Sequence, residues 1–213
     1  MTRHRLLVAI AVLAALLGWL LSGWEPTRRA ATEVTSALDL AAPPQGGDFT
    51  LDSAAGPVRL SDLRGQVVLI YFGYTTCPDI CPTNLAFLAA ALRELTPDEL
   101  QRVRVLFVSV DPERDDPPRL AVYAAYFHPN IQGVTGTPEQ VAQVAAQYGA
   151  AYRRTEQTGS AVGYLVDHSA YTYIVDPAGH LVQTLDHATP PERILAVMRR
   201  LLAVTPSKDT ADN

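Results

Sequence analysis

Val67–Pro82 reads VVLIYFGYTTCPDICP, and both cysteines of the chain lie in it. Val67–Phe72 is a continuous apolar run rich in β-branched and aromatic residues, which is typical of a strand buried on both faces. After Pro82, apolar residues at helical spacing form one stripe: Leu85, Leu88, Ala89, Leu92 and Leu95. The sequence therefore predicts a buried strand followed directly by a helix, with Cys77 and Cys81 at the junction.

A second apolar run, VRVLFVSV at Val103–Val110, predicts another buried strand after this helix. The order strand, helix, strand implies a right-handed parallel crossover. Leu120, Tyr123 and Phe127 then indicate a short helix. A further helix is predicted from Thr137-Pro138-Glu139-Gln140, which combines a capping residue, a first-turn proline and a capping-box glutamine.

Hairpin signals flank this parallel unit. Phe49–Leu51 and Val58–Leu60 predict a short hairpin on the N-terminal side. On the C-terminal side, Tyr171–Val175 and His180–Asp186 are joined by Asp-Pro-Ala-Gly, and a helix capped by Thr189-Pro190-Pro191-Glu192 closes the chain. A βαβ half followed by a ββα half predicts an α/β fold, namely a thioredoxin-like mixed sheet flanked by helices.

The N-terminal segment predicts a membrane anchor. Leu6–Trp24 contains nineteen residues without a charge, and about twenty helical residues span a bilayer. A cleaved secretory signal is the alternative, although the stretch exceeds the usual apolar region of a signal and lacks a well-placed cleavage site. We therefore expect an N-terminal transmembrane helix or signal over 1–24, a linker over 25–47, the thioredoxin-like domain over 48–204 and a polar tail over 205–213.

Charge limits the classes of partner. Without residues 1–24 the chain carries 15 basic and 22 acidic residues, a net charge of −7, since that segment holds two arginines and no acid. An acidic domain argues against nucleic acid as a partner and suits a cation or a protein with a basic patch. Charge does not settle the membrane orientation, because Arg3 and Arg5 precede the apolar segment while Arg28 and Arg29 follow it.

The position of the cysteine pair indicates a reactive or ligand-binding site. The carboxyl ends of parallel strands form a ligand crevice, and a helix N-terminus beside a thiol lowers its pKa. Pro78 and Pro82 each follow a cysteine and disfavour the helical conformation there, so we expect an irregular turn. A structural disulfide is the plain alternative, but closing so short a loop contributes only about 2 kcal/mol.

Two thiolates suit a soft metal such as copper(I), whereas a closed zinc site usually has four protein ligands. Histidine is the obvious third ligand. Spacing alone leaves the choice open among four candidates: His128, His168, His180 and His187.

Three blocks resemble the Sco/SenC family of copper chaperones for cytochrome c oxidase: YFGYTTCPDICP at Tyr71–Pro82, SVDPERD at Ser109–Asp115 and VDHSAYTYIVDPAGHL at Val166–Leu181. The resemblance covers about residues 48–202. It implies that Cys77, Cys81 and His168 bind copper, as Cu(I) or Cu(II). Asp111 resembles a family aspartate near the site, and ending a strand is its alternative role. Tyr74 and Tyr173 are candidates to shield the metal or to pack in the core. Asp167 either orients an imidazole or faces water.

The resemblance implies a protein that takes copper from an upstream donor and delivers it to the dinuclear copper centre in subunit II of cytochrome c oxidase. The alternative is a thiol-disulfide oxidoreductase that reduces the oxidase cysteines. No Arg/Ser-rich presequence is evident. We therefore expect a bacterial cytoplasmic membrane location, with a single pass and the soluble domain in the periplasm.

Overall fold

The computed structural model describes Leu16, Trp19 and residues 38–156 and 163–204. The predicted transmembrane helix, apart from those two helical residues, lies outside this part, as do most of the linker and the polar tail. Within the described residues, no helix combines the length and the apolar character that crossing a membrane requires.

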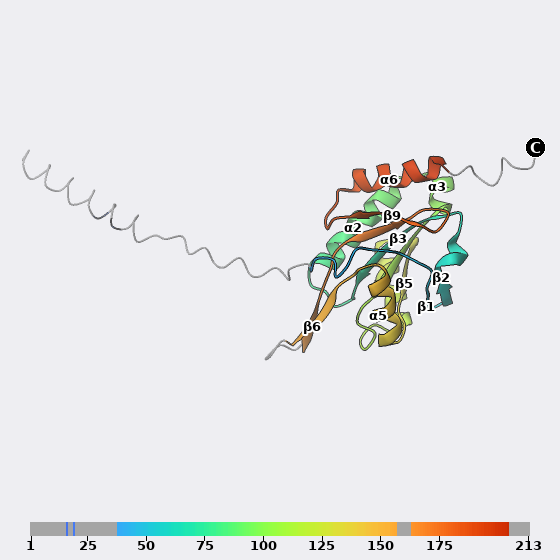
Figure 1. Ribbon diagram of the computed structural model, residues 1–213. Coiled ribbons are helices and arrows are strands. Elements are labelled where there is room, and N and C mark those ends of the chain that lie inside the picture. Colours follow the sequence, from blue (N-terminus) through green and yellow to red (C-terminus); the bar gives the residue numbers. More distant parts are fainter. Residues whose placement is uncertain (1–15, 17–18, 20–37, 157–162, 205–213) are drawn as a thin grey trace, which may run out of the picture. The chain divides into compact units, whose positions relative to one another are not determined.

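A five-stranded mixed sheet forms the centre of the fold (Figure 1). Its order is β5-β4-β3-β8-β9. The first three strands along the chain run parallel, and the C-terminal hairpin joins the sheet antiparallel to β3. The strands are β3 (Val67–Gly73), β4 (Val103–Ser109), β5 (Ile131–Val134), β8 (Thr172–Val175) and β9 (Leu181–Leu185). The predicted thioredoxin-like mixed sheet is confirmed.

Helices cover both faces of this sheet. They are α2 (Ile80–Arg93), α3 (Pro97–Gln101), α4 (Pro117–Phe127), α5 (Pro138–Gln147) and α6 (Pro191–Val204), with a 3-10 turn η1 (Leu60–Leu63) before β3. On one face the ring of Phe107 lies between those of Tyr71 and Tyr123, which joins the sheet to α4, and α6 packs on α2. On the other face the ring of Phe72 meets that of Tyr148, at the end of α5. Figure 1 shows α5 and α6 on opposite sides of the strands.

Strand β3 is buried along its whole length, as its unbroken apolar run predicts. The capping box of α5 is also confirmed, because Gln140 N–H donates to Thr137 Oγ1 while the Gln140 side chain accepts from Thr137 N–H. The hairpin turn before β9 closes with Asp176 N–H donating to the His180 carbonyl, and Gly179 adopts a φ of 84° there.

Two hairpins lie outside the main sheet. The predicted N-terminal hairpin is β1 (Thr50–Ser53) paired with β2 (Gly56–Arg59). The second, β6 (Tyr152–Glu156) paired with β7 (Tyr164–His168), was not predicted. Strand β6 reads YRRTE and is largely exposed, so it lacks the apolar alternation that marks a strand.

Local details of the cysteine segment differ from the sequence-based expectation. Helix α2 begins at Ile80, so Cys81 is helical, whereas we expected an irregular turn until Pro82. Proline is tolerated as the third residue of this helix because N–H groups of the first turn have no intrahelical partner. Cys77 does lie outside the helix, as predicted.

Candidate metal centre

The two sulfurs come from the junction between β3 and α2. Strand β3 delivers the chain to Gly73 at its carboxyl end, Cys77 lies in the loop that follows, and Cys81 is the second residue of α2. Both cysteines are buried and neither forms a disulfide. The junction therefore holds a reduced dithiol beside the N-terminus of a helix, where a thiolate is favoured.

The imidazole comes from the hairpin that was not predicted. His168 is the last residue of β7, where it pairs with Tyr152. Its Nδ1 lies 3.1 Å from the carbonyl oxygen of Ser169. With the ring hydrogen on Nδ1 donated to that oxygen, Nε2 carries the lone pair that a metal needs.

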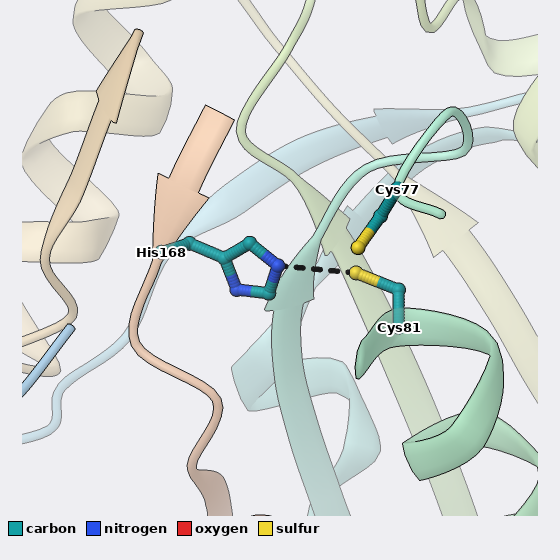
Figure 2. Close-up of side chains that lie close together, drawn as sticks. All are labelled: Cys77, Cys81 and His168. Atoms are coloured by element: carbon teal, nitrogen blue, oxygen red, sulfur yellow. Dashed lines mark hydrogen bonds between the residues drawn. The ribbon is translucent and has the colours of Figure 1, made fainter. Parts of the chain in front are cut away.

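Cys77, Cys81 and His168 converge on one point (Figure 2). One ligand atom from each lies within 4.8 Å of the others, and the Nε2 of His168 is 3.1 Å from the Sγ of Cys81. Cys77 is 6% exposed, Cys81 is 0% and His168 is 1%. The structure thus brings together the three residues that the resemblance selected, with Cys77 nearest to solvent.

Aromatic rings enclose the imidazole. The ring centroids of Tyr71 and Tyr74 lie 6.1 and 5.9 Å from that of His168, both edge-on. The hydroxyl of Tyr74 also accepts a hydrogen bond from Val166 N–H. Tyr74 therefore does flank the site as a candidate shield, and Tyr71 does so without having been predicted, since it reads as one more residue of a buried strand. Tyr173 packs elsewhere, against Phe72 and Tyr148.

The remaining candidates do not enter the centre. Asp167 faces away from the imidazole, because its carboxylate accepts from Arg153 and Thr155. Asp111 is buried and bonded to Arg114 and Tyr164. The other described histidines bind elsewhere or stand apart from the metal cluster: His128 accepts from Asn130 N–H, His180 is an exposed partner of Asp176, and His187 precedes α6.

The two thiols have unlike acidities. A hydrogen bond from Cys81 lowers the pKa of Cys77 from 9.0 to about 4, with further help from His168 and from backbone N–H groups. Burial raises the pKa of Cys81, and the neighbouring Cys77 thiolate raises it further. At neutral pH, Cys77 is therefore a thiolate and Cys81 is a thiol. The Cys77 thiolate can act both as a nucleophile and as a metal ligand.

We expect the ultraviolet absorbance of the Cys77 thiolate to appear with a midpoint near pH 4 in the folded protein. The unfolded-state pKa of cysteine is about 8.5. Since the folded value is lower, the thiolate contributes its full stability above that pH and loses it as the pH falls toward 4. A difference titration of the wild type against Cys77→Ser measures the midpoint. A value near that of a free cysteine would contradict the assignment.

Gly73 leaves space for the Cys81 sulfur. A Cβ at this position would lie 2.6 Å from Cys81 Sγ and 2.8 Å from the Phe107 ring. We expect Gly73→Ala to displace the sulfur, to lower the free energy of unfolding by about 1–3 kcal/mol, and to weaken metal binding. Urea denaturation and a metal titration measure the two effects.

Gly133→Ala is the matched control, because its Cβ would lie 2.7 Å from the Leu120 carbonyl oxygen and remote from the sulfurs. It should destabilise the chain and leave the metal affinity unchanged. Equal metal affinity in both variants would show that Gly73 does not shape the site.

The donor set fits a soft metal. Two sulfurs and one imidazole nitrogen within a single buried cluster match the preference of copper, and the reduced, convergent thiols need no disulfide to be broken first. The same dithiol also allows disulfide exchange.

This chain is similar in sequence and in structure to known proteins. The SCO1/SenC family model matches residues 39–203. The chain is 42% identical over 204 residues to the mitochondrial protein SCO2 homolog of Bos taurus. The match covers 94% of this chain and 76% of that protein. A solution structure of apo Sco1 from Thermus thermophilus matches with a TM-score of 0.67 and 41% identity, over 81% of this chain and 99% of the other. Bradyrhizobium japonicum ScoI with copper bound matches with a TM-score of 0.67 and 35% identity, over 74% and 99%.

Proposed function

The chain belongs to the SCO1/SenC family, and from this membership we propose that it binds copper through Cys77, Cys81 and His168 for the assembly of cytochrome c oxidase. We further propose that the recipient of the copper is the dinuclear copper centre in subunit II of cytochrome c oxidase. The observation that carries the copper-binding proposal is the convergence of two reduced sulfurs and one imidazole nitrogen within 4.8 Å. A relative that matches over most of its length holds copper, which supports the choice of metal.

The burial pattern supports transfer by ligand exchange. Cys81 and His168 are enclosed, while Cys77 retains slight exposure and carries the thiolate. An incoming ligand therefore reaches the metal beside Cys77 first, while the two inner ligands still hold it. Each exchange replaces one soft ligand by another, so the metal stays bound throughout the transfer.

A second function, thiol-disulfide exchange with the oxidase cysteines, is favoured by the low pKa of Cys77. The Cys77 thiolate would attack a disulfide sulfur of the partner and form a mixed disulfide, which breaks the partner's S–S bond and releases its second sulfur as a thiolate. Cys81 would then lose its proton to that released thiolate and attack the Cys77 sulfur, which releases the reduced partner and leaves the Cys77–Cys81 disulfide. Both functions use the same two sulfurs, and only copper binding uses His168.

The cellular setting belongs to the same proposal. We place the chain at a bacterial cytoplasmic membrane, held by one pass within residues 1–24, with the folded domain in the periplasm, where it would receive copper from an upstream donor. The uncharged stretch Leu6–Trp24 supports the anchor.

A transfer assay tests the proposed function. The reduced, copper-loaded full chain is mixed with the metal-free, reduced copper domain of subunit II. We expect copper to move to that domain, which is measured as copper per protein in each chain after the two are separated. If the metal-free chain instead reduces an oxidised subunit II domain while the loaded chain transfers no copper, the oxidoreductase is the correct function.

A further inference from the structure

A short turn after β4 carries two buried carboxylates. Asp111 is 4% exposed and Asp115 is 0% exposed. The turn closes on itself, because the N–H groups of Arg114 and Asp115 both donate to the Asp111 carbonyl. Carboxylates this deeply buried are costly unless they are hydrogen-bonded. The hydrogen-bond partners of Asp111 and of Asp115 lie in different segments, and each segment carries a residue of the metal centre.

Asp115 holds the cysteine loop. Its carboxylate accepts hydrogen bonds from both the N–H of Thr75, at 2.8 Å, and the hydroxyl of the same residue. It also accepts from the hydroxyl of Ser109 on β4, at 2.7 Å. Thr75 stands two residues before Cys77, so the carboxylate ties the loop that carries the outer sulfur to the end of the neighbouring strand.

Asp111 holds the strand that carries the histidine. Its carboxylate accepts from the Tyr164 hydroxyl at 2.7 Å and from Arg114. The Arg114 guanidinium in turn donates to the Tyr164 carbonyl at 3.0 Å and lies 3.6 Å from the centre of the Tyr164 ring. Tyr164 is the first residue of β7 and His168 is its last, so one short strand links this contact to the imidazole.

We propose that Asp111 and Asp115 are positioning residues that set the spacing between the sulfurs and the imidazole before copper arrives. Cys81 and His168 are 87 residues apart in the chain, so their approach depends on contacts between their segments. The turn Asp111–Asp115 contacts both segments. Asp115 bonds to the cysteine loop, and Asp111 bonds to the first residue of β7. The inference rests on the proposed copper ligands. Its consequence is a preorganised site, whose ligands need little ordering when the metal binds.

Two substitutions loosen the two contacts separately. Thr75→Val removes the hydroxyl that donates to Asp115 and accepts from Arg119. Tyr164→Phe removes the hydroxyl that donates to Asp111 and keeps the ring that lies against the Arg114 guanidinium. Tyr148→Phe is the control, since it removes a tyrosine hydroxyl bonded to the Gly47 carbonyl at 2.9 Å, away from the ligand segments. Thr75→Ser restores the hydroxyl and serves as the rescue.

Copper affinity is measured on the reduced full chain by competition with a coloured chelator, and the melting temperature is measured alongside. We expect Thr75→Val and Tyr164→Phe each to weaken copper binding about 10–100-fold, as loss of outer contacts to metal ligands commonly does. Thr75→Ser and Tyr148→Phe should bind as the wild type does. Affinities that simply follow the melting temperature across all four variants would overturn the proposal.

Amide hydrogen exchange in the metal-free protein supplies a readout that does not depend on the ligand assignment. We expect faster exchange in the cysteine loop of Thr75→Val and in β7 of Tyr164→Phe, each without change in the other segment. Uniform exchange in both segments would overturn the proposal. Unchanged copper binding in His168→Ala would refute the ligand set, and the exchange rates would still decide the role of the turn.

Discussion

His168→Ala should abolish tight copper binding while the disulfide between Cys77 and Cys81 still forms on oxidation. The substitution removes the only nitrogen among the three converging ligand atoms of the described site, and it leaves both sulfurs in place. Losing an outer contact of a ligand costs about 10–100-fold in affinity, so loss of the ligand itself should cost more than about 100-fold. A copper titration of the reduced chain measures this loss, and thiol counting after oxidation measures the disulfide.

The control for this experiment is His180→Ala. His180 is exposed, stands after the turn of the C-terminal hairpin and faces Asp176. It should keep near-equimolar copper binding. If His168→Ala also keeps it, the protein binds through the dithiol alone and the oxidoreductase becomes the better account. Melting temperatures establish that a loss of binding does not follow from unfolding, since His168 is buried.

Cys81→Ser should lose both copper binding and the disulfide. A hydroxyl is a poor ligand for a soft metal, and Cys81 is the residue whose sulfur lies 3.1 Å from the imidazole. The hydrogen bond from the Cys81 thiol is also the largest cause of the low pKa of Cys77, so that pKa should rise in Cys81→Ala, which has no donor at this position. Copper per protein, thiol counting and a pH titration measure the three effects.

Cys81→Ala is the companion variant, because it places no polar side-chain atom at this fully buried position. Both variants should behave alike toward copper. Binding retained in either variant would place the metal away from this helix.

Much of the fold could be predicted because its central elements have strong local patterns. The apolar run of β3 and the stripe of α2 identify a buried strand and the helix that covers it, and a parallel partner strand follows from their order. The position of Cys77 and Cys81 at the carboxyl end of β3 follows from the same pattern. These features depend on neighbouring residues, so the chain alone reveals them.

The histidine could not be chosen by local pattern. His168 ends a strand that pairs with the polar strand β6, and its distance from Cys81 depends on tertiary contacts. The family resemblance selected it, and the structure places it beside Cys81 and Cys77. The positions of Tyr71 and Asp115 near the site could not be predicted for a related reason. A tyrosine in a buried strand and an aspartate in a turn are common, and only their tertiary contacts connect them with the site.

X-ray absorption at the copper edge of the loaded, reduced full chain tests the central claim most directly. The account predicts two sulfur ligands and one imidazole nitrogen, with the imidazole signal absent from any copper that His168→Ala retains. A copper ion surrounded by nitrogen and oxygen atoms without sulfur, or by sulfur alone in the wild type, would contradict it.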